Sequence, residues 1–273
     1  MRIDTHAHLY ADDDVRYPMK AEPYRPERGV GTIDHLCAEV AANGIDRVVL
    51  VQTGSAYGWD NRLLADVARA HAGWTVGVCT LDPVAEKSLI ELERLVGEYN
   101  VKGVRIEVAN GRYRHAGSER LWARAGQLGA VVCAHLRREY LEELDQLLIQ
   151  FPDVPVILDH CAYPSVDEDA GGDVLSRVKQ LAVRENLYAK LTFGVTSSQG
   201  EYPFVDTWDM LRNVIDAFGP ERCMWGSDFP CEHWLRKASY AQHMALFTEE
   251  LGLSDTDVEW VLGGTALRVF WEG

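Results

Sequence analysis

The chain has 273 residues, of which 47% are hydrophobic, and its formal net charge is −15. This length suits a single α/β barrel, which commonly takes about 250 residues, and the hydrophobic fraction is sufficient for a large core. The negative charge argues against broad contact with nucleic acid or with anionic membrane surfaces. A small anionic substrate remains compatible with it, because a pocket can be locally basic.

We expect no secretory signal, because Met1 is followed at once by a polar, strand-like segment that does not resemble one. No apolar stretch approaches the roughly 20 residues of a membrane-spanning helix. Six cysteines are scattered without a Cys-x-x-Cys pair, which is typical of thiols that stay reduced. We therefore expect a cytoplasmic protein with neither a membrane nor a nucleic-acid partner. The sequence leaves the oligomeric state open, a homo-oligomer included.

Strand-like and helical segments alternate along the whole chain. A long connection at 10–31, a length typical of functional lids or disorder, precedes a helix that Thr32 caps and Gly44 ends. An acidic, Gly-rich loop precedes the helix expected at 173–185. Strict alternation without a linker predicts a single-domain (β/α)₈ TIM barrel over residues 1–273, with an open doubly wound sheet as the alternative. The strands are expected at 2–9, 47–52, 75–81, 101–108, 130–137, 154–160, 187–193 and 223–228.

The first strand places Asp4, His6 and His8 on one face, because side chains on a strand alternate. Buried imidazoles and carboxylates need partners, and two histidines spaced in this way can reach one metal ion. Core hydrogen bonds would explain an isolated His-x-His equally well. Asp4 lies two residues deeper in the barrel than His6, so we interpret it as a supporting partner.

Three later strands end in matching polar groups: His135 on the fifth, His160 on the sixth and Asp228 on the eighth. Chemistry in an α/β barrel takes place at the carboxyl ends of the strands. His6, His8, His135 and Asp228 form a set suited to one Zn²⁺ or a similar cation. His160 is left as a candidate acid–base residue.

In these residues the chain resembles the amidohydrolase superfamily. Within it, the chain is most similar to the branch of 2-pyrone-4,6-dicarboxylate lactonase and sugar-acid lactonases. The resemblance implies a hydrolase that opens a cyclic ester of a carboxylated small molecule. The motifs that carry it are Asp4-Thr-His-Ala-His8, His135, His160, Gly226-Ser-Asp228-Phe-Pro230, Val51-Gln52, Lys102-Gly-Val-Arg105 and Ala189-Lys-Leu191.

The resemblance also implies roles for the polar residues. Asp228 would be the general base on the attacking water, and His6 and His8 would bind metal or orient the substrate. His135 would be a third ligand or contact the scissile carbonyl, and His160 would assist proton transfer. We expect one divalent ion, with zinc the first choice, and a metal-free enzyme of this branch is the alternative.

Basic side chains directed at the same pocket indicate what it binds. Strand alternation points Arg105, Arg137 and Lys190 into the barrel, and guanidinium groups bind carboxylates bidentately. We expect these three residues, with Gln52 and Tyr163, to contact a small anionic substrate. Mutual neutralisation with nearby acids is the alternative for the cations.

Glu107 shares a strand face with Arg105 near the end of the fourth strand. An ion pair between the two is the favoured interpretation, and a ligand bridging two metal ions is the alternative.

Other activities fit the sequence less well. A metal-dependent non-oxidative decarboxylase or hydratase of an aromatic-derived acid would use the same metal set, but such enzymes often have longer chains and a different opening motif. A metal-dependent deoxyribonuclease also opens with Asp-x-His-x-His-Leu, but it carries Gly-Glu-x-Gly-Leu-Asp on the fourth strand, which this chain lacks. A non-catalytic binding protein would need neither Asp228 nor the full histidine set.

Overall fold

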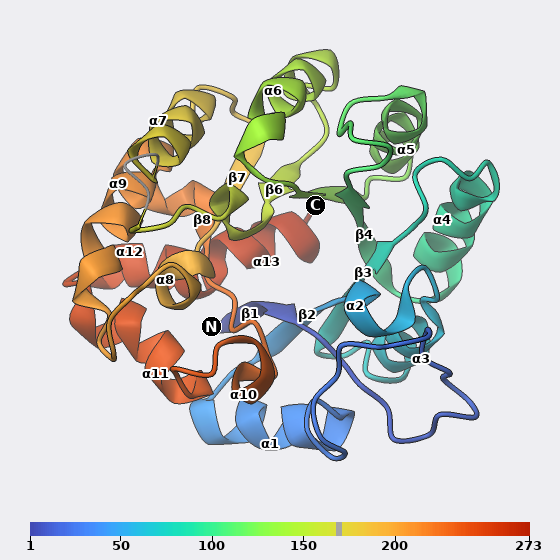
Figure 1. Ribbon diagram of the computed structural model, residues 1–273, viewed down its shortest axis with the longest axis horizontal. Coiled ribbons are helices and arrows are strands. Elements are labelled where there is room, and N and C mark those ends of the chain that lie inside the picture. The colour runs from blue at the N-terminus through green and yellow to red at the C-terminus, as the bar shows by residue number, and fades with distance from the viewer. Residues whose placement is uncertain (168–170) are drawn as a thin grey trace.

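The computed structural model describes residues 1–167 and 171–273. Eight parallel strands form one sheet, and their order in space is their order in the chain. Alternating helices surround them (Figure 1), which confirms the predicted (β/α)₈ barrel. The strands are β1 (Ile3–Ala7), β2 (Arg47–Val51), β3 (Thr75–Thr80), β4 (Val101–Glu107), β5 (Val131–His135), β6 (Val156–Leu158), β7 (Leu187–Lys190) and β8 (Cys223–Met224).

The helices follow the strands as expected, with three short additions, α2, α8 and α10, after β2, β7 and β8. The acidic loop expected before α7 includes residues 168–170, which lie outside the described residues. No helix in the described chain is long and apolar enough to cross a membrane. The helices are α1 (Ile33–Asn43), α2 (Gly54–Tyr57), α3 (Arg62–Ala70), α4 (Lys87–Glu98), α5 (Ala116–Gln127), α6 (Leu141–Gln150), α7 (Gly171–Leu181), α8 (Phe193–Thr196), α9 (Trp208–Phe218), α10 (Cys231–Trp234), α11 (Tyr240–Ala245), α12 (Asp255–Glu259) and α13 (Thr265–Phe270).

The barrel closes where the chain after β8 meets β1. The Thr5 amide donates to the Trp225 carbonyl at 3.3 Å, and the His8 amide donates to the Phe229 carbonyl at 2.8 Å. A Cβ on Gly226 would lie 2.7 Å from the Cβ of His6, so only glycine permits this approach. The closure therefore brings the residues after β8 against the first histidine.

Every strand is shorter than expected, and the sixth and eighth are shortened most, each ending where chemically active residues begin. The sixth strand stops at Leu158, and His160 to Tyr163 follow with positive φ angles. The eighth strand stops at Met224, and Asp228 has a φ of 57°. Positive φ is incompatible with a strand, so the chain leaves the sheet to present these side chains.

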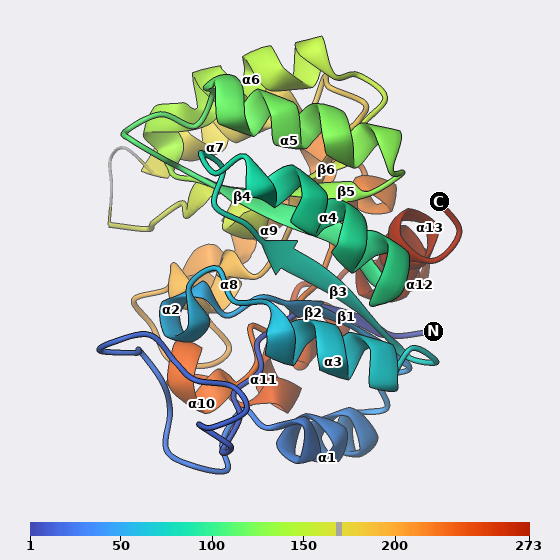
Figure 2. The same ribbon diagram turned by 90° about the vertical axis from the view of Figure 1, so that its right-hand side faces the viewer.

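The long connection at 10–31 is ordered against α2 and α3. The amides of Lys20 and Tyr24 donate to the carbonyls of Ala56 and Ser55, at 2.9 and 3.1 Å. Figure 2 shows α2, α8 and α10 at the end of the barrel opposite the two chain termini. This end holds the carboxyl ends of the strands, and the candidate site lies there.

Candidate active site

A pocket of about 450 Å³ opens at the carboxyl ends of the strands. Six of the residues predicted from the sequence line it, whereas His6 lies beneath it with Lys190, and both are fully buried. Gln52 and Arg137 do not line it. The lining residues are His8, Lys20, Thr53, Gly54, Ser55, Arg105, Glu107, His135, His160, Tyr163, Thr196, Asp228 and Trp234.

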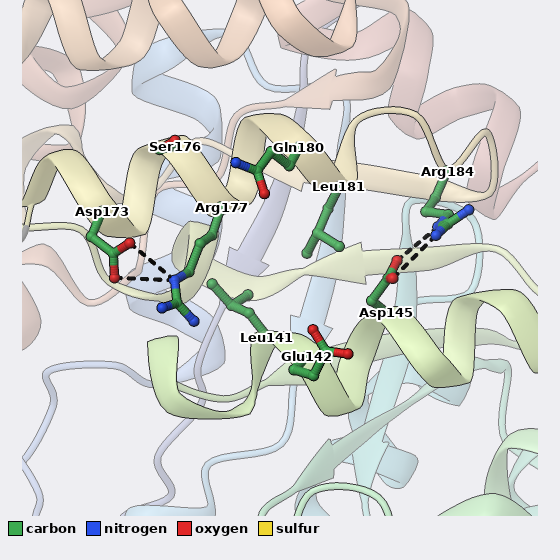
Figure 3. Close-up of a pocket in the computed structure, with 9 residues that line it drawn as sticks. All are labelled: Leu141, Glu142, Asp145, Asp173, Ser176, Arg177, Gln180, Leu181 and Arg184. Carbon is green, nitrogen blue, oxygen red and sulfur yellow. Dashed lines mark hydrogen bonds and ion pairs between the residues drawn. The ribbon is translucent and has the colours of Figure 1, made fainter.

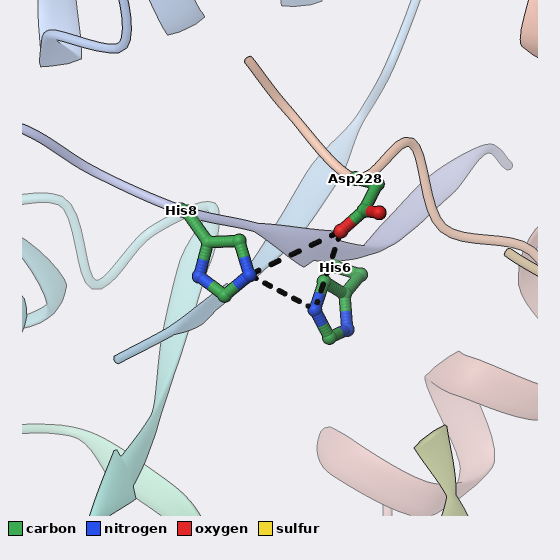
Figure 4. A group of neighbouring side chains, drawn as sticks. All are labelled: His6, His8 and Asp228. Atoms are coloured by element: carbon green, nitrogen blue, oxygen red, sulfur yellow. Dashed lines mark hydrogen bonds and ion pairs between the residues drawn. The ribbon is translucent and has the colours of Figure 1, made fainter. Parts of the chain in front are cut away.

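His6, His8 and Asp228 converge at one point beside this pocket (Figure 4). The Nε2 atoms of His6 and His8 lie 3.1 Å apart. Asp228 Oδ1 lies 3.6 Å from the first and 4.0 Å from the second. Three ligands of a tetrahedral zinc ion are separated by about 3.3 Å, so the spacing of these donors fits such an ion.

Asp4 fixes this arrangement from below. Its carboxylate accepts hydrogen bonds from the amides of His6 and Ser227, at 3.0 and 2.8 Å. It also accepts from the hydroxyls of Ser227 and Tyr240, at 2.6 and 2.8 Å. Asp4 thus joins β1 to the chain after β8 and has the supporting position expected for it.

The two histidines differ in how their second nitrogen is held. His8 Nδ1 lies 3.0 Å from the Val51 carbonyl, so it carries a proton and leaves Nε2 free as a ligand. His6 Nδ1 lies 3.1 Å from Lys190 Nζ, which can only donate. The proton of His6 therefore sits on Nε2 and points at His8. The three candidate ligand atoms are well placed for an ion. However, the proton on His6 Nε2 occupies the position that an ion would need.

Burial controls the charge of these three side chains. Desolvation, together with the charges of Asp159 and Asp4, raises the pKa of Asp228 to about 7, against the opposing effect of Arg105 and Lys190. Burial and the charge of Arg105 lower the pKa of His8 to about 3. Asp228 is therefore poised to exchange a proton near neutral pH, beside imidazoles that stay neutral.

Arg105, Asp159 and Lys190 form a buried charged array under the pocket. Asp159 Oδ2 accepts from Arg105 Nε at 2.9 Å, and its Oδ1 lies 2.8 Å from Lys190 Nζ. Although burial alone would raise the pKa of Asp159, the charges of Lys190 and Arg105 hold it well below its usual range. Two cations and one carboxylate leave one net positive charge at the floor of the pocket. No pattern in the sequence indicates Asp159, although the residue directly precedes His160.

His135 is not part of the donor group of His6, His8 and Asp228. Its Nε2 lies 2.7 Å from the Tyr163 hydroxyl, and its Nδ1 lies 3.4 Å from Glu107 Oε1. In the register of β4 and β5, Glu107 pairs directly with His135. Glu107 therefore contacts His135, and the expected ion pair with Arg105 is absent from the described residues because Arg105 binds Asp159 instead.

His160 reaches the pocket through an unusual backbone turn. Four successive residues, His160 to Tyr163, have φ between 48° and 60°, at a cost of about 1–2 kcal/mol for each L-residue. This turn stacks the rings of His160 and Tyr163 at 4.7 Å. The side chain of His160 is positioned by a hydrogen bond of 2.5 Å between its Nδ1 and the hydroxyl of Thr192. Backbone strain of this kind is concentrated at functional sites.

Gln52 and Arg137, both expected to bind substrate, lie elsewhere. The Gln52 amide donates to the carbonyl of Asp60 at 2.6 Å and so holds the loop around α2. Arg137 lies over the Tyr163 ring, 5.1 Å from its centroid, in an adjoining hollow. β5 ends at His135, so strand alternation no longer directs Arg137 inward.

Lys20 also lines the pocket, although no sequence motif indicates it. It comes from the 10–31 connection, whose arginines Arg16, Arg25 and Arg28 each pair with an aspartate. Among the described residues, Lys20 has no such partner, and its side chain lines the pocket. No periodic pattern could have distinguished it from the paired arginines.

A second hollow, of about 570 Å³, lies between α6 and α7 (Figure 3). Its charged side chains pair with one another: Arg184 with Asp145 at 2.7 Å, and Arg177 with Asp173 at 3.0 Å. These charges are already satisfied, so the hollow at the mouth of the barrel remains the candidate site.

A barrel that brings a His-x-His at the end of its first strand against an aspartate that follows its last strand has the site of an amidohydrolase. The chain belongs to the amidohydrolase family, whose model matches residues 3–271, and it is a hydrolase of this family. This confirms the resemblance of the sequence motifs.

Individual relatives agree with this assignment. The chain is 26% identical over 233 residues to the 4-sulfomuconolactone hydrolase of Rhizobium radiobacter, covering 83% of this chain and 75% of the relative. It is 23% identical over 243 residues to the L-fucono-1,5-lactonase of Burkholderia ambifaria, covering 84% and 80%. A crystal structure from Pseudomonas putida, to which 2-pyrone-4,6-dicarboxylic acid hydrolysis is ascribed, is 25% identical with a TM-score of 0.78, covering 98% and 97%.

Proposed function

We propose that the protein hydrolyses a lactone of a carboxylated small molecule, with Asp228 as the general base. The observation that carries this proposal is the position of Asp228, a buried carboxyl with a pKa of about 7 that lines the pocket beside two neutral histidines. The names of the two curated relatives both describe lactone hydrolysis, which supports the same reaction.

In this mechanism Asp228 accepts a proton from water as the water oxygen attacks the lactone carbonyl. The negative charge that develops on the carbonyl oxygen is stabilised by the net positive array of Arg105, Asp159 and Lys190. The ring C–O bond then breaks, and Asp228 or His160 returns a proton to the leaving oxygen. Arg105 and Lys20 provide positive charge for a substrate carboxylate.

A divalent ion is a second part of the proposal. His6, His8 and Asp228 would hold it, with zinc the expected ion because two imidazoles and a carboxylate suit it. Such an ion, when bound, lowers the pKa of water towards neutrality. His135 is not proposed as a ligand. A cytoplasmic location remains a prediction from the sequence, which leaves the oligomeric state open, a homo-oligomer included.

The test is a panel of sugar-acid lactones and pyrone carboxylates, with hydrolysis followed by proton release at constant pH. We expect turnover of at least one lactone well above the spontaneous rate. Release of CO₂ from a carboxylated aromatic acid, with no lactone hydrolysed, would instead establish the alternative decarboxylase.

A further inference from the structure

His243 is a fully buried histidine that has no part in the mechanism proposed above. It lies on α11, and its Nδ1 is 3.2 Å from the Ser227 carbonyl. A carbonyl oxygen only accepts hydrogen bonds, so the proton of the imidazole sits on Nδ1 and His243 is the donor. Burial lowers the pKa of His243 to about 4, against the opposing effect of this hydrogen bond. The ring is therefore neutral at neutral pH.

The second nitrogen of His243 indicates that packing alone does not explain this residue. Within the described chain, Nε2 is buried without a hydrogen-bond partner. The ring lies against the apolar rings of Trp225 and Phe247, whose centroids are 5.9 and 6.2 Å away. An unpaired buried acceptor costs stability, and an apolar side chain would fill the same space without that cost. The hydrogen bond to Ser227 is what a polar side chain adds here.

The carbonyl that His243 holds belongs to the peptide group between Ser227 and Asp228. A peptide group is planar, so its orientation, together with the position of the next residue, sets the φ angle of Asp228, which is 57°. The next residue is held as well. The Phe229 amide donates to Ser227 Oγ at 3.0 Å, and the Phe229 carbonyl accepts from the His8 amide at 2.8 Å. The backbone of Asp228 is thus fixed from both sides.

A positive φ at Asp228 requires such support. The left-handed region is unfavourable for L-residues, which remain there only where the surrounding contacts define the conformation. The Ser227 carbonyl also accepts from Cys231 Sγ at 3.5 Å, but a thiol is a weak donor. His243 is the stronger of these two donors and the one that can hold the peptide group in place.

We infer that His243 is a positioning residue, which fixes the peptide group before Asp228 and thereby directs the Asp228 carboxylate into the pocket. The inference rests on the proposed function for the role of Asp228 as the base, but not for the orientation of Asp228. Tyr240, one turn earlier on α11, donates to Asp4, which accepts from the Ser227 amide. This helix therefore holds the turn through both backbone groups of Ser227.

The test compares His243→Leu with His243→Asn, two branched side chains of similar shape, of which one keeps a donor. The amide nitrogen of Asn is bonded to Cγ, as Nδ1 of His is, so it can still donate to the Ser227 carbonyl. Crystal structures should show Asp228 with a φ near 57° in His243→Asn. In His243→Leu, Asp228 should leave the left-handed region or adopt two orientations. A single, unchanged orientation of Asp228 in His243→Leu would overturn the inference.

The second readout is hydrolysis of the lactone in the panel above that the wild type turns over fastest. His243→Leu should lower kcat about 10–100-fold and change KM less than about 3-fold, because a misplaced base impairs the transition state rather than substrate binding. His243→Asn should keep kcat within about 5-fold of the wild type. It should nevertheless unfold at a lower temperature than His243→Leu, because it buries an amide in apolar surroundings.

This order separates positioning from packing. If His243 only stabilised the fold, activity would follow stability, and His243→Leu would be the more active variant; that result would overturn the inference. The matched control is Met244→Ala, which removes packing from the same helix and should leave kcat within about 2-fold. His243→Phe is a second variant without the donor, should His243→Leu not fold. If no lactone is hydrolysed, the proposed function fails, whereas the crystal structures still decide the inference.

Discussion

The ammonium of Lys190 lies 3.1 Å from Nδ1 of His6, in the buried layer beneath the pocket. The second nitrogen of a metal-bound histidine normally donates to a carboxylate or a carbonyl, and His8 follows this rule through Val51. His6 does not, because Lys190 is itself a donor. Binding an ion at His6 Nε2 requires its proton to move to Nδ1 and face this ammonium. We therefore expect Lys190 to limit the affinity of the site for a metal ion.

Replacing Lys190 with Gln should strengthen zinc binding. The amide oxygen of Gln can accept a hydrogen bond from His6 Nδ1–H, and its NH₂ group can still donate to Asp159. Changes of this kind around a ligand alter metal affinity about 10–100-fold. Competition with a zinc chelator measures the effect, and Lys179→Gln on the exposed face of α7 is the matched control. Unchanged affinity in Lys190→Gln would contradict the assigned tautomer.

His135→Gln should leave zinc affinity within about 3-fold of the wild type, because His135 is held by Tyr163 and Glu107 and lies outside the donor group. His8→Gln, measured in the same titration, should lose about 100-fold or more, because it removes a direct ligand. Equal losses in the two variants would show that His135 is a ligand after all.

Activity of the metal-free protein should rise with pH. Asp228 acts as a base only when ionised, and its pKa is about 7, so kcat/KM should increase about tenfold per pH unit below 7 and level off above it. The stability that this raised pKa contributes is fully present below the ordinary value of 3.8 and is lost as the pH rises through 7. Urea unfolding between pH 5 and 8 should therefore show a decline that Asp228→Asn lacks.

Asp159→Asn should destabilise the fold by about 3–5 kcal/mol, because it leaves Arg105 and Lys190 buried without their carboxylate. The folded-state pKa of Asp159 is depressed, so its contribution is present above its ordinary pKa of 3.8 and is lost as the pH falls below it. The difference between variant and wild type in urea unfolding should thus shrink on acidification. A variant as stable as the wild type at pH 7 would contradict the structural role of this array.

The barrel and one part of the site could be predicted from the sequence because they follow from strand periodicity. Met224 faces the barrel interior, and strand alternation in the sequence assigns Asp228 to the same face. β8 ends at Met224, but the chain that follows it still places Asp228 in the pocket. His6 lies in the same way on β1, and His8 directly follows that strand. Residues on one face at the ends of parallel strands must converge, and the structure brings these three together.

His160 shows where periodicity fails. Ile157 faces the interior and Leu158 the surrounding helices, so strict alternation would direct His160 outward and Asp159 inward. His160 reaches the pocket only through the left-handed turn, which no composition or spacing indicates in L-residues. The inward Asp159 is instead the centre of the charged array.

The positions of Lys20 and Glu107 in the site could not be predicted, because each depends on contacts between segments that are distant in the sequence. Which cation of the 10–31 connection stays unpaired is decided by the fold of that connection. Glu107 contacts His135 because β4 and β5 pair in that register, whereas the pattern along one strand favoured Arg105, its neighbour two residues away.

The measurement that tests the central claim most directly is lactone hydrolysis by Asp228→Asn, assayed by proton release at pH 8 on a lactone that the wild type turns over. Asn keeps the shape of the side chain but cannot accept the proton of water, so kcat should fall at least about 10³-fold while thermal unfolding shows an intact fold. Retention of more than a tenth of wild-type kcat would contradict Asp228 as the base.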